Sequence, residues 1–414
     1  MATADTVPRI LVYLLRRDLR HSDNPVLFEA AKEYSGESKF THFLPIYAFP
    51  AQQIEVSGFL KGSEPSSPYP EARSQVAGNW RCGPHRAKFL AESVWDLKES
   101  LKLAESGLVI RAGLIADVIR HAFEYLEKPK DDSTASPQAE RAEIVGVWMT
   151  GDVTTEERQE ELDVQQIVEG HGKEFRLFTD EKFFVDEYDH LLRFNSLRAC
   201  KLTFLSRDLP FEDIEDLPDV YTTFRKPVEP LRSQPKKPLG KPSKLPPLRP
   251  SDLIPPPLDP FAVPSSRDNL VECLLRPLGP EFGFTDPLSW QPNPDKDSES
   301  AHPFSGGESQ AQDRLDYLLH SGAITRYKDT RNGLLGLDFS TKLSSWLALG
   351  YISARQVHAW MCCFEDGSAT AVAYLSKRLR RQGQTEGALT NTKVSLVSAL
   401  KNATFFNQSA IDRP

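Results

Sequence analysis

The feature that most restricts the fold of this chain is an alternation of short apolar runs with helical patterns between residues 8 and 180. The apolar runs, which are of the buried-strand type, are Ile10–Leu15, His42–Phe49, Leu108–Ile110, Ile144–Met149 and the shorter Phe175–Phe178. Helical patterns fill residues 87–101, 114–126 and 156–168 between them, and Asp23 or Asn24 followed by Pro25 marks a further helix start. Strands that are separated by helices predict a parallel sheet covered on both faces.

Proline-rich segments interrupt this rhythm. Residues 57–76 are rich in Ser, Pro and Glu, which is typical of a surface insertion. The densest proline run lies between Pro227 and Pro264, and its composition favours an extended connector between domains. A role of its PxxP pieces in binding a partner stays open. From Glu308 onward the pattern is helical, with Ser353 expected to cap a helix that runs to about Glu365.

Composition narrows the class of protein. At 414 residues, with 39% hydrophobic and 26% charged residues, the chain has room for two or three ordinary globular domains. The net charge of −8 argues against a broadly cationic surface for nucleic acid, although a local basic groove remains possible. No apolar run approaches membrane length. The five cysteines have no metal spacing, so we expect free thiols in a reducing, intracellular compartment and no metal site.

A cluster of hydroxyl groups stands before the short apolar helix expected at residues 343–349. It comprises Ser340, Thr341, Lys342, Leu343 and Ser344. Such a cluster can cap the helix, because Ser and Thr side chains accept from unpaired N–H groups at a helix start. It can equally form an anion site, because a helix start offers N–H donors and the positive end of a dipole to a phosphate. The two readings stay open on these residues alone.

Neighbouring residues favour a larger ligand. Tyr327 offers an aromatic face, Arg331 a guanidinium, and Gly306-Gly307-Glu308 a flexible turn. Together with the hydroxyl cluster they suit a flat ring system that carries a diphosphate. Each piece has an ordinary alternative, since Tyr327 can be a core aromatic and Arg331 a partner of a surface carboxylate such as Asp329.

The ordered combination of motifs resembles the photolyase/cryptochrome family, and within it the DASH-type cryptochromes. The matching segments are Val12–Val26 (VYLLRRDLRHSDNPV), Gly83–Leu97 (GPHRAKFLAESVWDL), Leu217–Lys226 (LPDVYTTFRK), Gly306–Glu308 and Tyr327–Ser353 (YKDTRNGLLGLDFSTKLSSWLALGYIS). The resemblance implies an α/β parallel-sheet, Rossmann-like N-terminal domain followed by the first part of an all-α FAD-binding domain. The corresponding domains are 8–200, a connector at 201–264 that is Pro-rich from 227, a partial helical domain at 265–365 and a divergent tail at 366–414.

The same resemblance implies cofactors and partners. The family holds an antenna pigment, usually 5,10-methenyltetrahydrofolate, on the α/β domain and FAD on the helical domain. Tyr327 matches a ring-stacking position, and Ser340 to Ser344 match the loop around the flavin phosphates. Arg331 matches a position that faces the DNA backbone, so pyrimidine-dimer DNA, preferentially single-stranded, is the expected partner of a monomer.

Asp152 follows the fourth strand, where the family commonly has a glutamate that accepts from the pterin. Its side chain is one methylene shorter than that glutamate, and a role in starting the next helix, shared with Thr154 or Thr155, is the alternative. No catalytic residue is assigned.

The resemblance ends near Glu365. Residues 366–414 match none of the expected flavin-binding helices, and Trp346 and Trp360 do not match the electron-relay positions, so both are expected in the core. We therefore expect a half-built flavin pocket and impaired function. Three readings follow: a light-dependent flavoprotein with photolyase or photoreceptor function, an α/β module that binds a pterin or nucleotide without photochemistry, and an inactive product.

Overall fold

A computed structural model of the chain describes residues 7–36, 38–62, 66–127, 142–152, 154–180, 218–228, 237–288, 303–330, 332–333 and 337–365. The chain divides into two compact units. The first comprises Met1–Asp180, Leu239–Ala311 and Leu349–Tyr351, and the second comprises Glu181–Pro238, Gln312–Ala348 and Ile352–Pro414. The domain borders expected from the sequence stay a prediction.

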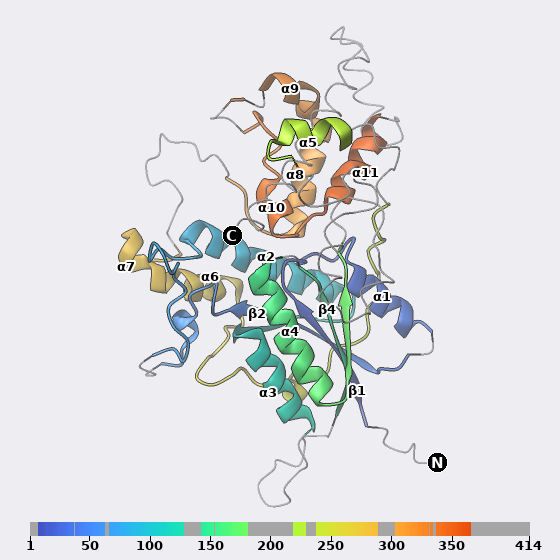
Figure 1. Ribbon diagram of the computed structural model, residues 1–414, viewed down its shortest axis with the longest axis vertical. Coiled ribbons are helices and arrows are strands. Elements are labelled where there is room, and N and C mark those ends of the chain that lie inside the picture. Colours follow the sequence, from blue (N-terminus) through green and yellow to red (C-terminus); the bar gives the residue numbers. More distant parts are fainter. Residues whose placement is uncertain are drawn as a thin grey trace, which may run out of the picture. The chain divides into compact units, whose positions relative to one another are not determined.

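A parallel sheet forms the centre of the first unit (Figure 1). Its strands are β1 (Arg9–Leu15), β2 (His42–Pro50), β3 (Val109–Gly113), β4 (Glu143–Thr150) and β5 (Glu174–Phe178). They lie in the order β3-β2-β1-β4-β5, with Val12 of β1 opposite Leu44 of β2 and Val147 of β4. The predicted parallel α/β fold is therefore confirmed.

The helices of the first unit are α1 (Pro25–Tyr34), α2 (Pro84–Leu103), α3 (Ile115–Glu127), α4 (Thr155–Gly170), α6 (Arg267–Leu275) and α7 (Gly279–Phe282), with one-turn helices at Ser57–Phe59, Ser251–Leu253 and Arg276–Leu278. Four of them, α1 to α4, were predicted, whereas α6 was not and α7 begins just before a segment that was expected to be a loop. Asn24 caps α1, because its side chain accepts from the Leu27 N–H at 2.9 Å, and Pro25 takes the first helical position. That predicted helix start is confirmed.

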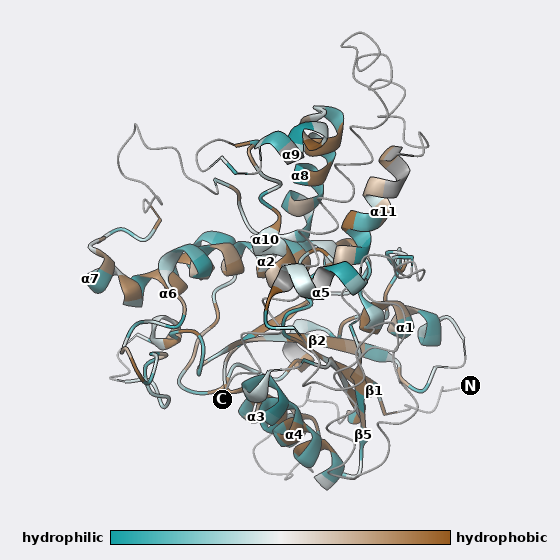
Figure 2. Cartoon of the chain, turned by 45° about the horizontal axis from the view of Figure 1, so that its top comes forward, coloured by the Kyte–Doolittle hydropathy of each residue, from teal (hydrophilic) through white to brown (hydrophobic). Residues whose placement is uncertain are grey.

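The main core lies between the sheet and helices α3 and α4. Alternate residues of β1, such as Ile10 and Val12, point to one face and pack with Ile119 and Phe123 of α3 and Val164 of α4. Figure 2 shows this as apolar colour along β1 and β2 and polar colour on the outer surface of α4. The helical patterns of α3 and α4 arise from this packing, and the continuous apolar runs of the strands arise because both faces of the sheet are covered.

The later part of the proline-rich run packs on the first unit. The Leu245 N–H donates to the Ala104 carbonyl at 2.9 Å, and the Phe43 N–H donates to the Pro247 carbonyl at 3.0 Å. Leu245 and Phe261 are fully buried. Residues 237–262, which we call the strap, are thus extended as their composition suggests, but they are ordered because the sheet unit satisfies their backbone groups.

The second unit is helical in its described part. It contains α5 (Tyr221–Val228), most of α8 (Glu308–His320), α9 (Tyr327–Thr330), α10 (Ser344–Ala348), α11 (Ala354–Glu365) and a one-turn helix at Ala323–Arg326. Ser353 caps α11 as predicted, since the Gln356 N–H donates to its Oγ at 3.1 Å and the Gln356 side chain accepts from the Ser353 N–H at 2.7 Å. Among the described helices, none is long and apolar enough to cross a membrane.

The two tryptophans of this part differ. Trp346 is fully buried, as predicted. The core prediction for Trp360 was wrong, because 37% of the residue is exposed on a face of α11 that the described residues leave uncovered. The predicted tail, residues 366–414, lies outside the described residues.

Candidate functional site

A topological switch point brings two loops together in the first unit. The chain leaves β1 toward β2 on one side and leaves β4 toward β5 on the other. In open parallel sheets ligands bind in the crevice outside the carboxyl ends of strands at such a point. Arg16 and Arg17 directly follow β1, and Gly151 and Asp152 directly follow β4.

A network of arginines and carboxylates joins these loops to α4. Arg17 forms an ion pair with Glu157 and lies 3.6 Å from the Asp152 carboxylate. Arg16 pairs with Glu160 at 3.5 Å and with Glu161. Burial opposes the charge of Arg16, but the two facing carboxylates outweigh burial and raise the pKa of its guanidinium.

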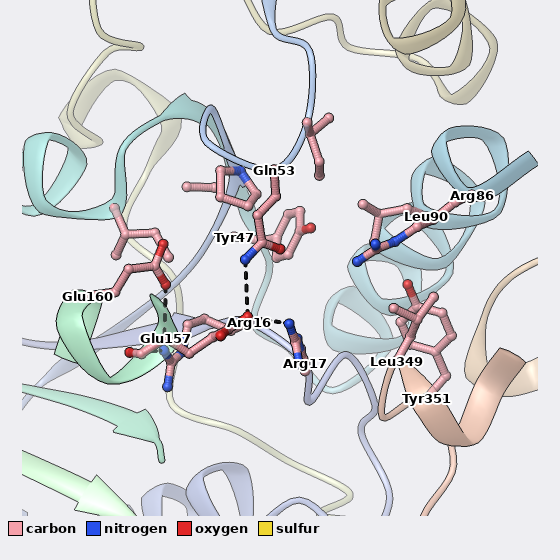
Figure 3. A pocket seen from close by; sticks show the side chains of 14 residues that line it. Arg16, Arg17, Tyr47, Gln53, Arg86, Leu90, Glu157, Glu160, Leu349 and Tyr351 are labelled. Carbon is pink, nitrogen blue, oxygen red and sulfur yellow. Dashed lines mark hydrogen bonds and ion pairs between the residues drawn. The ribbon is translucent and has the colours of Figure 1, made fainter. Parts of the chain in front are cut away.

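Beside this network lies a pocket that is partly open to solvent (Figure 3). Its lining residues come from the loop after β1, the end of β2, the starts of α2, α3 and α4, and one distant turn: Arg16, Arg17, Tyr47, Ala48, Pro50, Gln53, Ile54, Arg86, Leu90, Ile115, Glu157, Glu160, Leu349 and Tyr351. All of them belong to the first unit. A pocket with mostly apolar walls and a few converging polar groups is the usual form of a small-molecule site.

Polar groups in the pocket have unusual environments. Burial raises the pKa of Glu160, and Arg16 and Gln52 only partly oppose this effect. Burial also raises the pKa of Tyr47 and of Tyr351; Ser93 and then Arg86 oppose this effect at Tyr351, and Arg86 opposes it at Tyr47. The Tyr351 hydroxyl is buried and has no hydrogen-bond partner within the described residues. Such an unpaired buried hydroxyl is costly and is a common sign of a group that serves a ligand.

The turn Leu349–Tyr351 reaches the pocket from late in the sequence. Gly350 has a left-handed backbone (φ 72°), and a side chain at this position would collide with the Arg17 carbonyl oxygen. Its own carbonyl accepts from buried Arg20 at 3.0 Å. Arg20 also pairs in a bidentate manner with Asp180 at 2.6 and 2.7 Å, so the turn is fixed against the loop after β1.

The Gly306–Glu308 motif anchors the same loop. Glu308 accepts from the His21 N–H at 2.6 Å and from the Ser22 N–H at 3.0 Å. A side chain at Gly306 would collide with the Phe89 carbonyl, so this position requires glycine. Residues 306–308 are therefore joined to the loop between β1 and α1 within the first unit.

Asp152 lies beside the pocket and outside its lining. Its carboxylate faces Arg17, and its N–H donates to Glu161 at 2.7 Å. Thr154 precedes α4 as the alternative reading expected, but its hydroxyl makes no capping bond. The sequence indicated residues 151–157 as a ligand position after the fourth strand but gave a role only to Asp152, so Glu157 was not assigned and Glu160 was missed.

In the second unit, one arginine holds the loop that carries the hydroxyl cluster. Buried Arg314 of α8 donates to the carbonyls of Leu337 at 2.8 Å, Thr341 at 3.2 Å and Ser340 at 3.4 Å. It also pairs with Asp338 at 3.1 Å. The loop carbonyls thus converge on one cation, which fixes the shape of residues 337–341.

The sequence-predicted flavin residues lie around this loop. Lys342 adopts a left-handed backbone (φ 60°), Leu343 is buried, and Ser344 opens α10. Tyr327 is buried at the start of α9, and Thr330 at the end of α9 donates to the Asp338 carbonyl at 3.4 Å. The predicted DNA-contact residue Arg331 lies outside the described residues.

The capping reading of the hydroxyl cluster receives limited support. Thr341 Oγ1 accepts from the Leu343 N–H, but only at the long distance of 3.5 Å. The first N–H groups of a helix have no acceptor inside the helix, and α10 itself is only five residues long. Both readings are compatible with the geometry.

Comparison with known proteins gives concordant matches. The model of the DNA photolyase family matches residues 11–187. A Neurospora crassa protein named as a mitochondrial cryptochrome DASH is 42% identical, with 87% of this chain and 44% of the relative covered. A cryptochrome DASH of Xenopus laevis is 32% identical, with 84% of this chain and 51% of the relative covered. The chain thus spans about half the length of the curated relatives that it matches.

Solved structures agree with these matches. The crystal structure of a Synechocystis cryptochrome is similar with a TM-score of 0.58 and 25% identity, over 94% of this chain and 62% of that one. A bacterial class III photolyase of Agrobacterium tumefaciens has a TM-score of 0.50 at 18% identity, over 92% of this chain and 59% of that one, which supports the fold alone.

Proposed function

Because this chain belongs to the photolyase/cryptochrome family, we propose that it acts as a DASH-type cryptochrome, a blue-light-dependent flavoprotein. The family depends on flavin, and the matching curated relatives are cryptochromes DASH. Their names do not state an activity, and the chain spans about half of their length. Light-dependent repair or light sensing is therefore a proposal for this chain.

The pocket at the switch point is the proposed antenna site, and it is the observation that carries the proposal. Its apolar walls suit a flat ring, and the carboxylates of Glu157 and Glu160 stand where they could accept from the N–H edge of a pterin. We propose 5,10-methenyltetrahydrofolate as the ligand. Asp152 then acts indirectly, by holding Arg17 at the pocket wall.

The loop at residues 337–344 is the proposed FAD site. FAD carries a diphosphate, and the hydroxyl cluster of residues 340–344 would supply the donors for this anion. Buried Arg314 keeps the carbonyls of Leu337, Ser340 and Thr341 directed to itself, and Tyr327 lies on the short helix that Thr330 ties to this loop. These features fit the group. When bound, reduced flavin supplies the light-driven electron, and the residues of this chain bind and orient it.

The proposed substrate is DNA that contains a pyrimidine dimer, preferentially single-stranded, bound by a monomer. Arg331 remains the proposed phosphate contact, because Arg favours the bidentate recognition of phosphate. Its replacement by Gln should weaken binding to damaged and undamaged strands alike, since a phosphate contact carries no sequence information.

The alternative function is a pterin- or nucleotide-binding α/β module without photochemistry. A specific observation favours it: every residue that lines the pocket belongs to the first unit. On this alternative, the first unit binds its pterin or nucleotide whether or not flavin is bound elsewhere.

Absorption spectra of the purified full chain separate these functions. The proposal expects a near-ultraviolet pterin band together with visible flavin bands, and blue-light repair of a single-stranded oligonucleotide that contains a pyrimidine dimer. The same sample kept in the dark is the control. A pterin band without flavin would support the binding module, and one flavin per chain would contradict the expectation of a half-built flavin pocket. Absence of both pigments after reconstitution would overturn the proposal.

A further inference from the structure

One arginine of the pocket has a charge that no facing group neutralises. Arg86 of α2 lines the pocket, and within the part of the chain that the structure describes it makes no hydrogen bond and no ion pair. Arg16 and Arg17, the other two arginines of the lining, are both paired with carboxylates of α4. Arg86 is therefore available to a ligand.

The two sides of the pocket differ in charge. Figure 3 shows Glu157 and Glu160 with their arginine partners on one side and Arg86 with Tyr351 on the other. Asp152, Glu157, Glu160 and Glu161 outnumber Arg16 and Arg17, so the α4 side carries an excess of negative charge. The α2 side carries the positive charge of Arg86.

Two phenol groups stand near Arg86. Its charge acts on both Tyr47 and Tyr351, and Figure 3 shows Tyr351 on the same side of the pocket as Arg86, with Tyr47 beside Gln53. The Tyr351 hydroxyl is buried close to Ser93, whose own hydroxyl donates to the Phe89 carbonyl at 2.7 Å, and it makes no well-aligned hydrogen bond in the described residues. A guanidinium with an adjacent hydroxyl donor is a suitable receptor for a carboxylate or a phosphate.

We propose that Arg86 determines ligand specificity by binding an acidic substituent, with Tyr351 as a second donor. The ligand is then a planar ring whose hydrogen-bond donor edge faces Glu157 and Glu160 and whose anionic group faces α2. This assignment rests on the proposed antenna function of the pocket. It adds an orientation and a charge requirement that the apolar walls alone do not impose.

The test compares matched probes that differ only in charge. The first pair is 5,10-methenyltetrahydrofolate and its diamide, in which both glutamate carboxylates are neutral. The second pair is flavin mononucleotide and riboflavin, which differ by a phosphate. Binding of each probe to the full chain is measured by fluorescence titration at low and moderate salt, for wild type, Arg86→Gln, Arg86→Lys and Tyr351→Phe. Lys102→Gln, an exposed position on the same helix, is the control for loss of one charge.

Because Arg86 is exposed, we expect Arg86→Gln to weaken the anionic member of a pair about twofold to fivefold, as for an exposed charge pair, and to leave the neutral member unchanged. Arg86→Lys should restore part of the loss, Tyr351→Phe should reduce binding of the anionic probe alone, and Lys102→Gln should behave as wild type. The salt dependence should disappear in Arg86→Gln.

Failure of this inference is distinct from failure of the proposed function. If neither folate probe binds but flavin mononucleotide is preferred over riboflavin through Arg86, the pterin assignment is wrong and the role of Arg86 stands. If wild type discriminates within neither pair, or if Arg86→Gln weakens both members equally, the role of Arg86 is overturned.

Discussion

At the scale of single residues, Gly350 shows how one backbone conformation completes the pocket. Its left-handed φ of 72° turns the chain between Leu349 and Tyr351, both of which line the pocket. The Arg17 carbonyl lies so close that no side chain fits. Conformation and contact therefore both require glycine here.

Gly350→Ala should lower the free energy of unfolding by about 3 kcal/mol or more, because a left-handed alanine is strained and its methyl group would displace the loop after β1. Gly78 provides a matched control, since it has a similar φ of 68° with no atom near a new side chain. Gly78→Ala should cost only about 1 kcal/mol. Denaturant unfolding of both variants measures the difference, and equal costs would show that the Arg17 contact is unimportant.

The roles of some single residues could be predicted from the sequence, and those of others could not. Asn24 and Ser353 were predictable as caps, because a cap depends on neighbours within four residues. The environment of Asp152 was not, because its partner Arg17 lies far away in the sequence. Whether Asp152 serves a pterin stays a prediction.

At the scale of elements, the loop of residues 337–341 depends on a cation from another helix. Arg314→Met should reduce FAD affinity about tenfold or more, because three loop carbonyls would lose a charge-assisted donor and the loop would no longer be fixed. Fluorescence titration with FAD measures this effect. Arg326→Met, at an exposed position of the same unit, is the control. If Arg314→Met binds FAD as tightly as the wild type, the loop of residues 337–341 has no role in FAD binding.

The loop between β1 and α1 carries a pH dependence. Burial, with the nearby charge of Lys241, lowers the pKa of His21 to about 4, whereas an unfolded chain has the ordinary histidine pKa of about 6.5. The unfolded chain therefore takes up a proton first, and stability is lost as the pH falls from about 6.5 toward 4.

At pH 5 the His21 contribution should amount to about 2 kcal/mol of lost stability relative to pH 8. The check is the difference between wild type and His21→Gln in denaturant unfolding across this range, because carboxylates titrate in both proteins and cancel. Parallel pH profiles for the two proteins would contradict the assignment.

Some elements of this fold were easier to predict from the sequence than others. The strands were predictable because burial on both faces makes each an apolar run, as in Ile10–Leu15. The ordered packing of the strap was not predictable. Its proline composition predicts an extended backbone, but it does not predict whether the backbone carbonyl groups accept hydrogen bonds from the rest of the unit. Phe43 and Arg111 of the sheet donate these hydrogen bonds, to Pro247 and Pro255.

At the scale of the whole molecule, each proposed ligand should act on its own set of segments. Bound methenyltetrahydrofolate should slow amide hydrogen exchange in residues 47–54, 86–90, 157–160 and 349–351, because these segments line one pocket. FAD should instead protect residues 337–344. Hydrogen exchange followed by mass spectrometry, with and without each ligand, reads both effects. Protection of 337–344 by the pterin alone would contradict separate sites.

Chain order explains why the whole pocket could not be derived from the sequence. The switch point follows from the order of the strands. Leu349 and Tyr351 line the pocket because of the turn at Gly350, and the sequence around Gly350 does not predict this contact. The ordered motifs identified the family, whereas the site required contacts across more than 300 positions.

The Gly350 turn also has a consequence during synthesis. The last strand of the sheet ends at Phe178, about 170 positions before Tyr351. At translation rates of about 5–20 residues per second, a nascent chain spends roughly 10–35 s with its sheet made and the final wall of the pocket still missing. The proposed ligand can therefore bind a complete pocket only after residues 349–351 have been synthesised.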